Sequence, residues 1–397
     1  LTSPTRPAPP RASALILLEA EYLAAEEAAE EAERSPGAGT DEEQVARLMR
    51  LADLSLRLGR LPAGLHACDR AMALAKAGDV VTHASLGLLC ARLQLRTLQL
   101  KEALEAARTG LAPNFILKGS VPRALVLQLT ALEAQALFQM GEVGAARDRL
   151  EAEGASIDAG RAERPLPLVL PYAEVLSHLG QRREAVQLLK EVADSSETSF
   201  DAAPRMELKT LLAGVLLADG DPDAAYAEAR EGLDRAADVA DAPLVASAHL
   251  MLGRTLVELG AAAAADAEFL AANREADAMG ARALLLEAQL GLAATHRLRG
   301  QFVAAEVAAR VALQFAAASS ARVLQSRAEH QLALVSVASG ASAEARSALE
   351  RTRVLARGVR DSALHIDVLI QLAARSRAAG EPSRARDLAL EAWTEAS

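Results

Sequence analysis

The sequence predicts an all-α solenoid of about nine helix-turn-helix repeats, and three columns of residues carry the prediction. A glycine recurs inside each repeat, and from Gly180 onward its step is forty residues. A small residue stands seven positions before that glycine, as at Ala173 and Ala213, and another stands five positions after it, as at Ala185. Columns that keep constant offsets along the chain are hard to obtain from alanine abundance alone. They indicate one repeated unit.

Each repeat is expected to contain two helices joined by a short turn. Glycine ends the first helix because it tolerates the left-handed backbone conformation of a helix terminus. The small residues on either side let the two helices cross closely, and one repeat fits with Leu98 in the place of the glycine. No run has the alternation of a strand, and aromatic residues make up only 3% of the chain. The turns are expected near residues 59, 98, 141, 180, 220, 260, 300, 340 and 380.

The chain divides into three parts. Residues 1–10 are proline-rich and are interpreted as a linker. Residues 11–40 are expected to form an N-terminal capping helix and a loop, since another repeat there would put the linker prolines into its first helix. Residues 41–397 form the predicted solenoid.

Both ends of the chain suggest that the native protein is longer. The sequence begins at Leu1 with a linker-like stretch, and no polar capping helix follows Trp393. We expect the native protein to continue beyond the last helix, or a partner or second copy to cover it. Self-association through this C-terminal end is therefore one expectation.

Composition argues against two classes of partner. The chain has 43 Lys+Arg and 53 Asp+Glu, for a formal net charge of −10, and an acidic excess repels phosphate backbones. Nucleic acid is thus not expected as a ligand. No apolar run approaches the roughly 20 residues needed to span a bilayer, so membrane insertion is not expected either. We expect a cytoplasmic protein.

Residues that could carry chemistry are few. Cys68 and Cys90 lack metal-ligand spacing and are interpreted as reduced core thiols. The histidines are scattered, and His296 is expected to be a hydrogen-bonded core residue. Residues 118–120 resemble the end of a phosphate loop, but the earlier glycine of that motif is missing. We expect no enzyme activity, no metal and no cofactor.

The three columns resemble the tetratricopeptide repeat (TPR), in which they are the eighth, fifteenth and twentieth consensus positions. Leucine often precedes the small residue, as at Leu212 and Leu252, which also matches. The usual TPR length is 34 residues, whereas this chain repeats at forty. The pattern is similar to the long TPR variants of kinesin light chains, Pins-type spindle adaptors and the sensor arms of MalT-like bacterial regulators. The resemblance covers about residues 41–397 and implies a right-handed superhelix whose first helices line a concave groove.

The resemblance also implies which residues face the groove, namely those at consensus positions two, five, nine and twelve. In this chain the fifth and twelfth positions are mostly apolar, and the second and ninth are more polar. An apolar floor with polar walls suits an amphipathic helix or an extended peptide. Alternatively, the apolar positions pack against the next repeat. The expected partner-binding groove contains Met49, Asp53, Leu88, Arg92, Gln135, Phe138, Leu170, Glu174, Leu250, Arg254, Leu290, Arg297, Arg327, His330 and Ile370.

Two further sets of charged residues belong to the same helices. Glu207 and Glu287 occupy second positions. Arg92 with Arg96 could anchor a carboxylate of a partner, although arginine pairs on helices are more often a solvated face. These residues add to the polar walls without deciding what binds there.

Three functions are compatible with the sequence. The preferred one is a protein-interaction scaffold that binds a helix or peptide of a partner protein in its groove, as one region of a larger signalling or assembly protein. The second is an effector-sensing regulatory arm of a MalT-like nucleotide-dependent regulator or kinase. The third is a substrate-recruiting fragment of an enzyme whose catalytic domain lies elsewhere.

Overall fold

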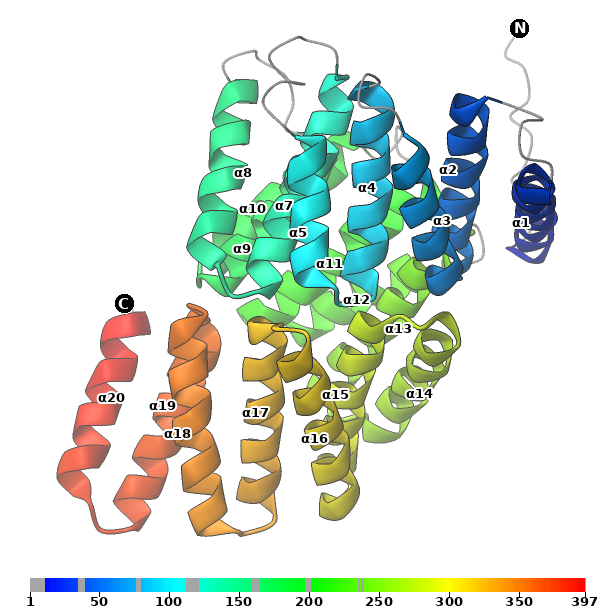
Figure 1. Cartoon of the computed structure of the whole chain (residues 1–397). Coiled ribbons are helices and arrows are strands. Elements are labelled where there is room, and N and C mark those ends of the chain that lie inside the picture. Colours follow the sequence, from blue (N-terminus) through cyan, green and yellow to red (C-terminus); the bar gives the residue numbers. More distant parts are fainter. Residues whose placement is uncertain are drawn as a thin grey trace, which may run out of the picture.

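A computed structural model describes residues 11–34, 40–75, 80–111, 121–158, 165–196, 201–234, 236 and 239–396. Within these ranges every long element is an α-helix and there is no strand, so the all-α prediction is confirmed. The helices follow one another as antiparallel pairs that stack in chain order (Figure 1). The predicted linker, residues 1–10, lies outside the described residues, as does most of the predicted loop before residue 41.

After the N-terminal helix α1 (Arg11–Arg34), the described chain forms nine pairs of helices. The first helices of the pairs are α2 (Asp41–Leu58), α4 (Val80–Arg96), α7 (Arg123–Gln139), α9 (Leu166–His178), α11 (Ala202–Asp219), α13 (Ala242–Glu258), α15 (Arg282–Leu298), α17 (Arg322–Ala338) and α19 (Ser362–Ala378). The second helices are α3 (Leu61–Leu74), α5 (Leu100–Gly110), α8 (Val143–Asp158), α10 (Arg182–Ser196), α12 (Pro222–Asp234), α14 (Ala262–Met279), α16 (Phe302–Ala318), α18 (Ser342–Gly358) and α20 (Pro382–Ala396).

The turns inside the pairs adopt left-handed backbone. Gly141 has a φ of +85°, and its amide donates to the Phe138 carbonyl at 2.9 Å while the next amide donates to the Leu137 carbonyl at 2.8 Å. Both bonds satisfy carbonyls that the helix end would leave free. Leu98, which replaces the glycine in one repeat, has the same left-handed conformation with a φ of +59°. Its side chain is buried, which offsets the backbone strain.

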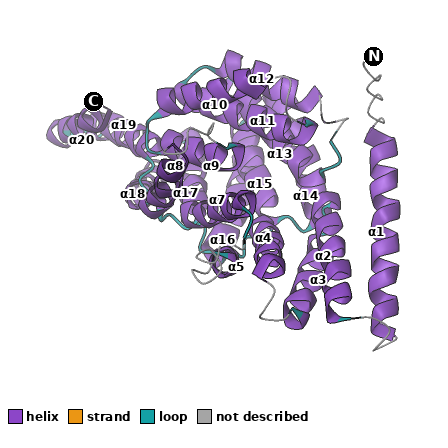
Figure 2. Ribbon diagram, turned by 90° about the horizontal axis from the view of Figure 1, so that it is seen from above, coloured by secondary structure: helices purple, strands orange, loops and turns teal. Residues whose placement is uncertain are grey.

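Helix α1 packs against α2, the first helix of the first pair (Figure 2). Leu18 and Tyr22 are buried in the contact, and the Arg60 guanidinium carbon lies 4.1 Å from the centre of the Tyr22 ring. The same guanidinium is 3.0 Å from the Glu19 carboxylate. A cation above an aromatic face adds electrostatic attraction to the apolar burial.

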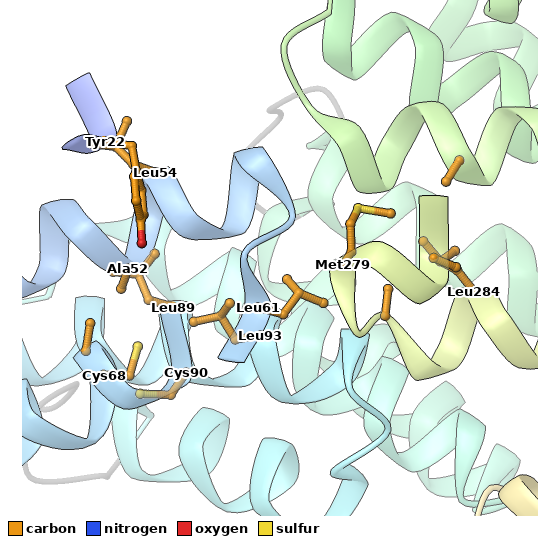
Figure 3. Packing of buried hydrophobic residues seen from close by; sticks show 14 of the residues in the cluster. Tyr22, Ala52, Leu54, Leu61, Cys68, Leu89, Cys90, Leu93, Met279 and Leu284 are labelled. Atoms are coloured by element: carbon orange, nitrogen blue, oxygen red, sulfur yellow. The ribbon is translucent and has the colours of Figure 1, made fainter. Parts of the chain in front are cut away.

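The superhelix turns far enough for its second turn to pack on its first. Helices α2, α4 and α7 contact α13, α15 and α17, respectively. Figure 3 shows Met279, at the end of α14, beside Leu61 at the start of α3. Farther along, His178 Nε2 lies 2.8 Å from the Val359 carbonyl, 181 residues later in the chain. One hydrophobic core therefore joins repeats that are far apart in sequence.

Some turn glycines also allow this contact between superhelical turns. A Cβ at Gly141 would lie 2.9 Å from Val359 Cγ1 and 3.1 Å from Arg322 Cβ. A Cβ at Gly220 would meet nothing within 4 Å, although its φ of +88° is nearly that of Gly141. Glycine at position 141 is thus required by packing as well as by backbone conformation.

This difference makes a testable prediction. Gly141→Ala and Gly220→Ala should share a similar backbone strain, but Gly141→Ala should cost about 1 to 3 kcal/mol more in unfolding free energy because it overpacks the contact. Urea unfolding of both variants measures the difference. Equal loss of stability in the two variants would contradict this account of the contact.

Candidate functional site

The first helices line the inside of the superhelix, and the second helices lie outside them. In the view from above, α10, α12 and α14 lie farther out than α9, α11 and α13 (Figure 2). Successive first helices pack side by side from α7 through α17. Side chains at the second and ninth positions of these helices can therefore face one another across the interior.

One group of four charged residues gathers there, and we call it the Arg254 cluster. It consists of Glu174 on α9, Arg254 on α13, Glu287 on α15 and Arg327 on α17. All four side chains are half-buried. Among the described residues none of the four has an ion-pair partner within 4.0 Å, so each charge is near others without being neutralised in a direct contact.

The electrostatics of the Arg254 cluster reflect this lack of direct pairs. Burial raises the pKa of Glu174, and the nearby Glu287 carboxylate raises it further, against the opposing charges of Arg327 and Arg254. Burial lowers the pKa of Arg254, and the like charge of Arg327 adds to this, against the opposing charges of Glu287, Glu174 and Glu258. The folded chain thus holds these two charged groups in a place that disfavours their charge.

A second group, the Arg92 cluster, lies nearer the N-terminus. It consists of Asp53 on α2, Arg92 and Arg96 on α4, Glu207 on α11 and Asp241 just before α13. Glu207 is exposed to solvent, and desolvation by the surrounding protein raises its pKa, as does the Asp241 carboxylate, whereas the charges of Arg96 and Arg92 lower it. Arg92 Nη2 donates to Gln128 Oε1 at 3.4 Å.

Other predicted polar residues lie on the same series of helices. Burial lowers the pKa of Arg297, opposed by the charge of Glu258, and its Nε has no hydrogen-bond partner among the described residues. His330 Nε2 lies 3.0 Å from Asp367 Oδ2 on the next first helix. Gln135 is half-buried on α7. The polar walls therefore extend beyond the two clusters.

The predicted apolar residues have a different environment. Leu88, Phe138, Leu170 and Leu250 are buried in hydrophobic clusters with neighbouring helices. Packing within the solenoid accounts for their apolar character, and they present little surface to a ligand. Met49 and Leu290 are half-buried at the edges of such clusters, while Ile370 is 55% exposed.

The list of groove residues did not include several members of the clusters. The sequence placed Glu207 and Glu287 at second positions without including them in the groove. It gave Arg96 two roles, as an anchor for a partner carboxylate or as part of a solvated helix face. Asp241 precedes its helix, where its carboxylate accepts from the Leu244 amide at 3.0 Å, so the consensus columns could not reveal it. A capping aspartate next to a groove helix is the signal that could have found it.

The cysteines and histidines form no metal centre in the described ranges, where no group of three or more His, Cys, Asp or Glu could hold a metal ion. Cys68 and Cys90 are free and buried side by side (Figure 3). A hydrogen bond to Cys90, together with burial, raises the pKa of Cys68. His296 is half-buried, with Nδ1 2.9 Å from Gln301 Oε1.

Of the helices that the structure describes, none is sufficiently long and apolar to span a membrane.

The last helix, α20, has apolar side chains on its surface. Leu390 and Trp393 are 59% and 71% exposed, respectively. Self-association through this end stays a prediction.

Known proteins resemble the chain in structure but not detectably in sequence. No protein-family model matches the chain, and no curated protein sequence matches it. The structure of a Rap protein complexed with competence and sporulation factor has a TM-score of 0.60, at 15% identity, over 89% of this chain and 98% of that one. This structural match agrees with the paired helices and the repeat columns of the present chain. The chain is a TPR-like repeat protein.

Two more structures share this TPR-like fold. The Rap conjugation gene regulator of plasmid pLS20, in complex with the Phr* peptide, has a TM-score of 0.53 at 14% identity and covers 88% of this chain and 94% of its own. The apo quorum sensor NprR from B. thuringiensis has a TM-score of 0.50 at 12% identity and covers 90% and 99%, respectively. Identities this low show the fold alone.

Proposed function

We propose that this TPR-like protein binds a linear peptide segment of a partner on the inner surface of its superhelix, and so acts as an interaction scaffold or regulator. The observation that carries the proposal is the pair of clusters on the first helices, whose charged side chains are half-buried or, for Glu207, exposed, and form no direct ion pair among the described residues. A solenoid that needed these residues only for stability would be expected to pair them, because unpaired buried charge is unfavourable.

The shape of the inner surface favours an extended peptide over an amphipathic helix. A helix that docks in a groove needs exposed apolar side chains at the floor. Leu88, Leu170 and Leu250 are instead buried in the solenoid. Polar and charged side chains make up the accessible walls, and these suit the backbone and charged groups of an extended segment.

A structural neighbour supports the same proposal. The Rap regulator of plasmid pLS20, which shares the fold, was solved with a peptide bound. Peptide binding by a superhelix of this length is therefore compatible with the architecture. The residues that would recognise a peptide in this chain are argued from its own clusters.

Photo-crosslinking can test the site directly. Random linear dodecapeptides displayed on phage would be selected on the immobilised full chain, and enriched peptides would be resynthesised with a benzophenone group. We expect crosslinks on the first helices, from α4 through α17, and none on α14, α16 or α18. Selection without enrichment, or crosslinks confined to the second helices, would overturn the proposal.

A further inference from the structure

Resting on the proposed function, we infer that Arg254 and Arg327 jointly bind a carboxylate of the peptide, while Glu174 and Glu287 bind a cationic group close to it. The Arg254 cluster is thus a site for two neighbouring opposite charges. A peptide can supply the carboxylate from its C-terminus or from an acidic side chain, and the cation from lysine, arginine or a free N-terminus.

The position of the four residues supports this inference. They come from α9, α13, α15 and α17, and α9 makes no substantial contact with α17 in the described structure. Helix α7 contacts both α9 and α17, and α13, α15 and α17 pack one against the next, so the four helices lie close together. One ligand that carries both charges would lie beside side chains from several of these helices.

The lack of internal pairing supports a ligand rather than a structural network. Elsewhere in the chain, partly buried charges pair directly, as in the 2.8 Å contact of Arg108 with Glu133 and the 2.9 Å contact of Arg149 with the same carboxylate. In the Arg254 cluster no such contact occurs among the described residues. The donors of both guanidinium groups remain available to a carboxylate, which arginine binds in a bidentate geometry.

Like charges next to each other define where each part of the ligand binds. Burial and the neighbouring Arg327 charge both disfavour the charged form of Arg254. A carboxylate between the two arginines removes that repulsion and replaces lost hydration with charge-assisted hydrogen bonds. A cation beside Glu174 and Glu287 does the same for the two carboxylates, because burial and Glu287 disfavour the charge of Glu174.

The mixed charge of the cluster also limits the ligand. Two carboxylates beside the arginines would repel a polyanion, and the formal net charge of the chain is −10. A nucleic acid or a polyphosphate therefore fits poorly. A short peptide segment with one carboxylate and one cation fits both halves of the cluster.

Affinity selection with defined peptide mixtures tests the inference. The probes are random hexapeptides in four mixtures, with the C-terminus free or amidated and with Asp and Glu present or omitted. We expect the wild-type full chain to retain peptides only from mixtures that contain a carboxylate. Arg254→Gln and Arg327→Gln should each reduce retention about tenfold or more, by loss of charge-assisted hydrogen bonds.

Matched variants control for general effects of charge. Arg310 lies on α16, outside the interior, and pairs with Glu306 at 2.6 Å; Arg310→Gln should leave retention unchanged. Arg327→Lys, which keeps the charge but not the bidentate geometry, should retain part of the binding. If amidation of the C-terminus abolishes retention, the C-terminal carboxylate of the peptide binds in the site. If amidated peptides are retained only when they contain Asp or Glu, a side-chain carboxylate binds there.

The thermal stability of the variants without peptide gives a second test. Because Arg254 lacks a direct partner, Arg254→Gln should leave the thermal midpoint of the free chain unchanged or raise it. A fall of several degrees would identify a structural network and overturn the inference. Equal retention of peptides by the wild type and by the two glutamine variants would also overturn the inference about the Arg254 cluster, but would not contradict peptide binding by the chain. Retention of no peptide by the wild type would contradict both proposals.

Discussion

Gly291→Ala is expected to lower the free energy of unfolding by about 3 kcal/mol, at the upper end of the usual cost of overpacking a core. A Cβ on Gly291 would lie 2.2 Å from Phe269 Cε1. The ring has little room to move, because it is fully buried and also lies close to the backbone of Gly253, where a Cβ would be 2.8 Å from the same atom. Thermal unfolding measures the loss.

A second glycine inside a helix is the matched control. A Cβ on Gly214 would meet only the end of a flexible side chain, with Met251 Cε at 2.8 Å and Sδ at 3.6 Å. Gly214→Ala should therefore be neutral or stabilise the chain by about 0.5 to 1 kcal/mol through helix propensity. A shared loss in both variants would show that helical glycine in general, and not the Phe269 contact, determines the effect.

A double variant isolates the contact. Phe269→Leu removes the ring atoms that a new Cβ would meet, so Gly291→Ala should cost less when Phe269 is already leucine. The coupling energy between the two sites is the quantity to measure. Additive effects would contradict the proposed contact.

The same contact shows what the sequence alone could predict. Gly253 stands in the column where other repeats have alanine, and the columns were sufficient to predict where the helices cross. Local geometry determines such columns, because each depends only on the two helices of one pair. The identity of the side chain that fills the space at Gly253 depends on the three-dimensional packing of Phe269 with two first helices, which the columns do not contain.

Contacts between superhelical turns could not be predicted from the sequence for a different reason. The rotation from one pair to the next is small, and its sum over several repeats decides which residues meet. Nothing in the local pattern relates His178 to Val359, although the structure joins them. Likewise, the second and ninth positions predicted charged walls, but only the curvature of the superhelix brings Glu174 of α9 near Arg327 of α17.

The floor of the predicted groove was ambiguous in principle. A leucine at the fifth position is expected both for a groove and for packing between first helices. Burial of Leu88, Leu170 and Leu250 therefore needed coordinates to become apparent. Charged residues were more informative, since a half-buried charge without a direct partner has no equivalent explanation from packing.

His178 is expected to make the contact between superhelical turns sensitive to pH. Its Nε2 donates to the Val359 carbonyl at 2.8 Å, and its ring meets Phe138 edge to face at 5.0 Å between centroids. Burial lowers the pKa of His178, and the Arg327 charge adds to this, whereas Asp361 and the bond to Val359 oppose it. Burial is the largest of these effects.

The sign follows from proton binding. Because the pKa of His178 is lower in the folded chain, the unfolded chain binds more protons as the pH falls below the ordinary histidine value of about 6.5. The contribution of this residue to stability is complete above that pH and is lost on acidification, by at most about 1.4 kcal/mol per pH unit. Urea midpoints at pH 7.5, 6.5 and 5.5 should fall in that order.

Substitution separates this residue from other groups that titrate. His178→Ala should cost about 3 kcal/mol at pH 7.5, since it opens a cavity beside Phe138 and leaves the Val359 carbonyl without its donor. It should also flatten the decline of the urea midpoint between pH 6.5 and 5.5, whereas His66→Ala, at an exposed position on α3, should leave the midpoint at pH 7.5 unchanged. If His178→Ala keeps the full pH dependence, other groups control it, and the contact between turns is held by its apolar packing alone.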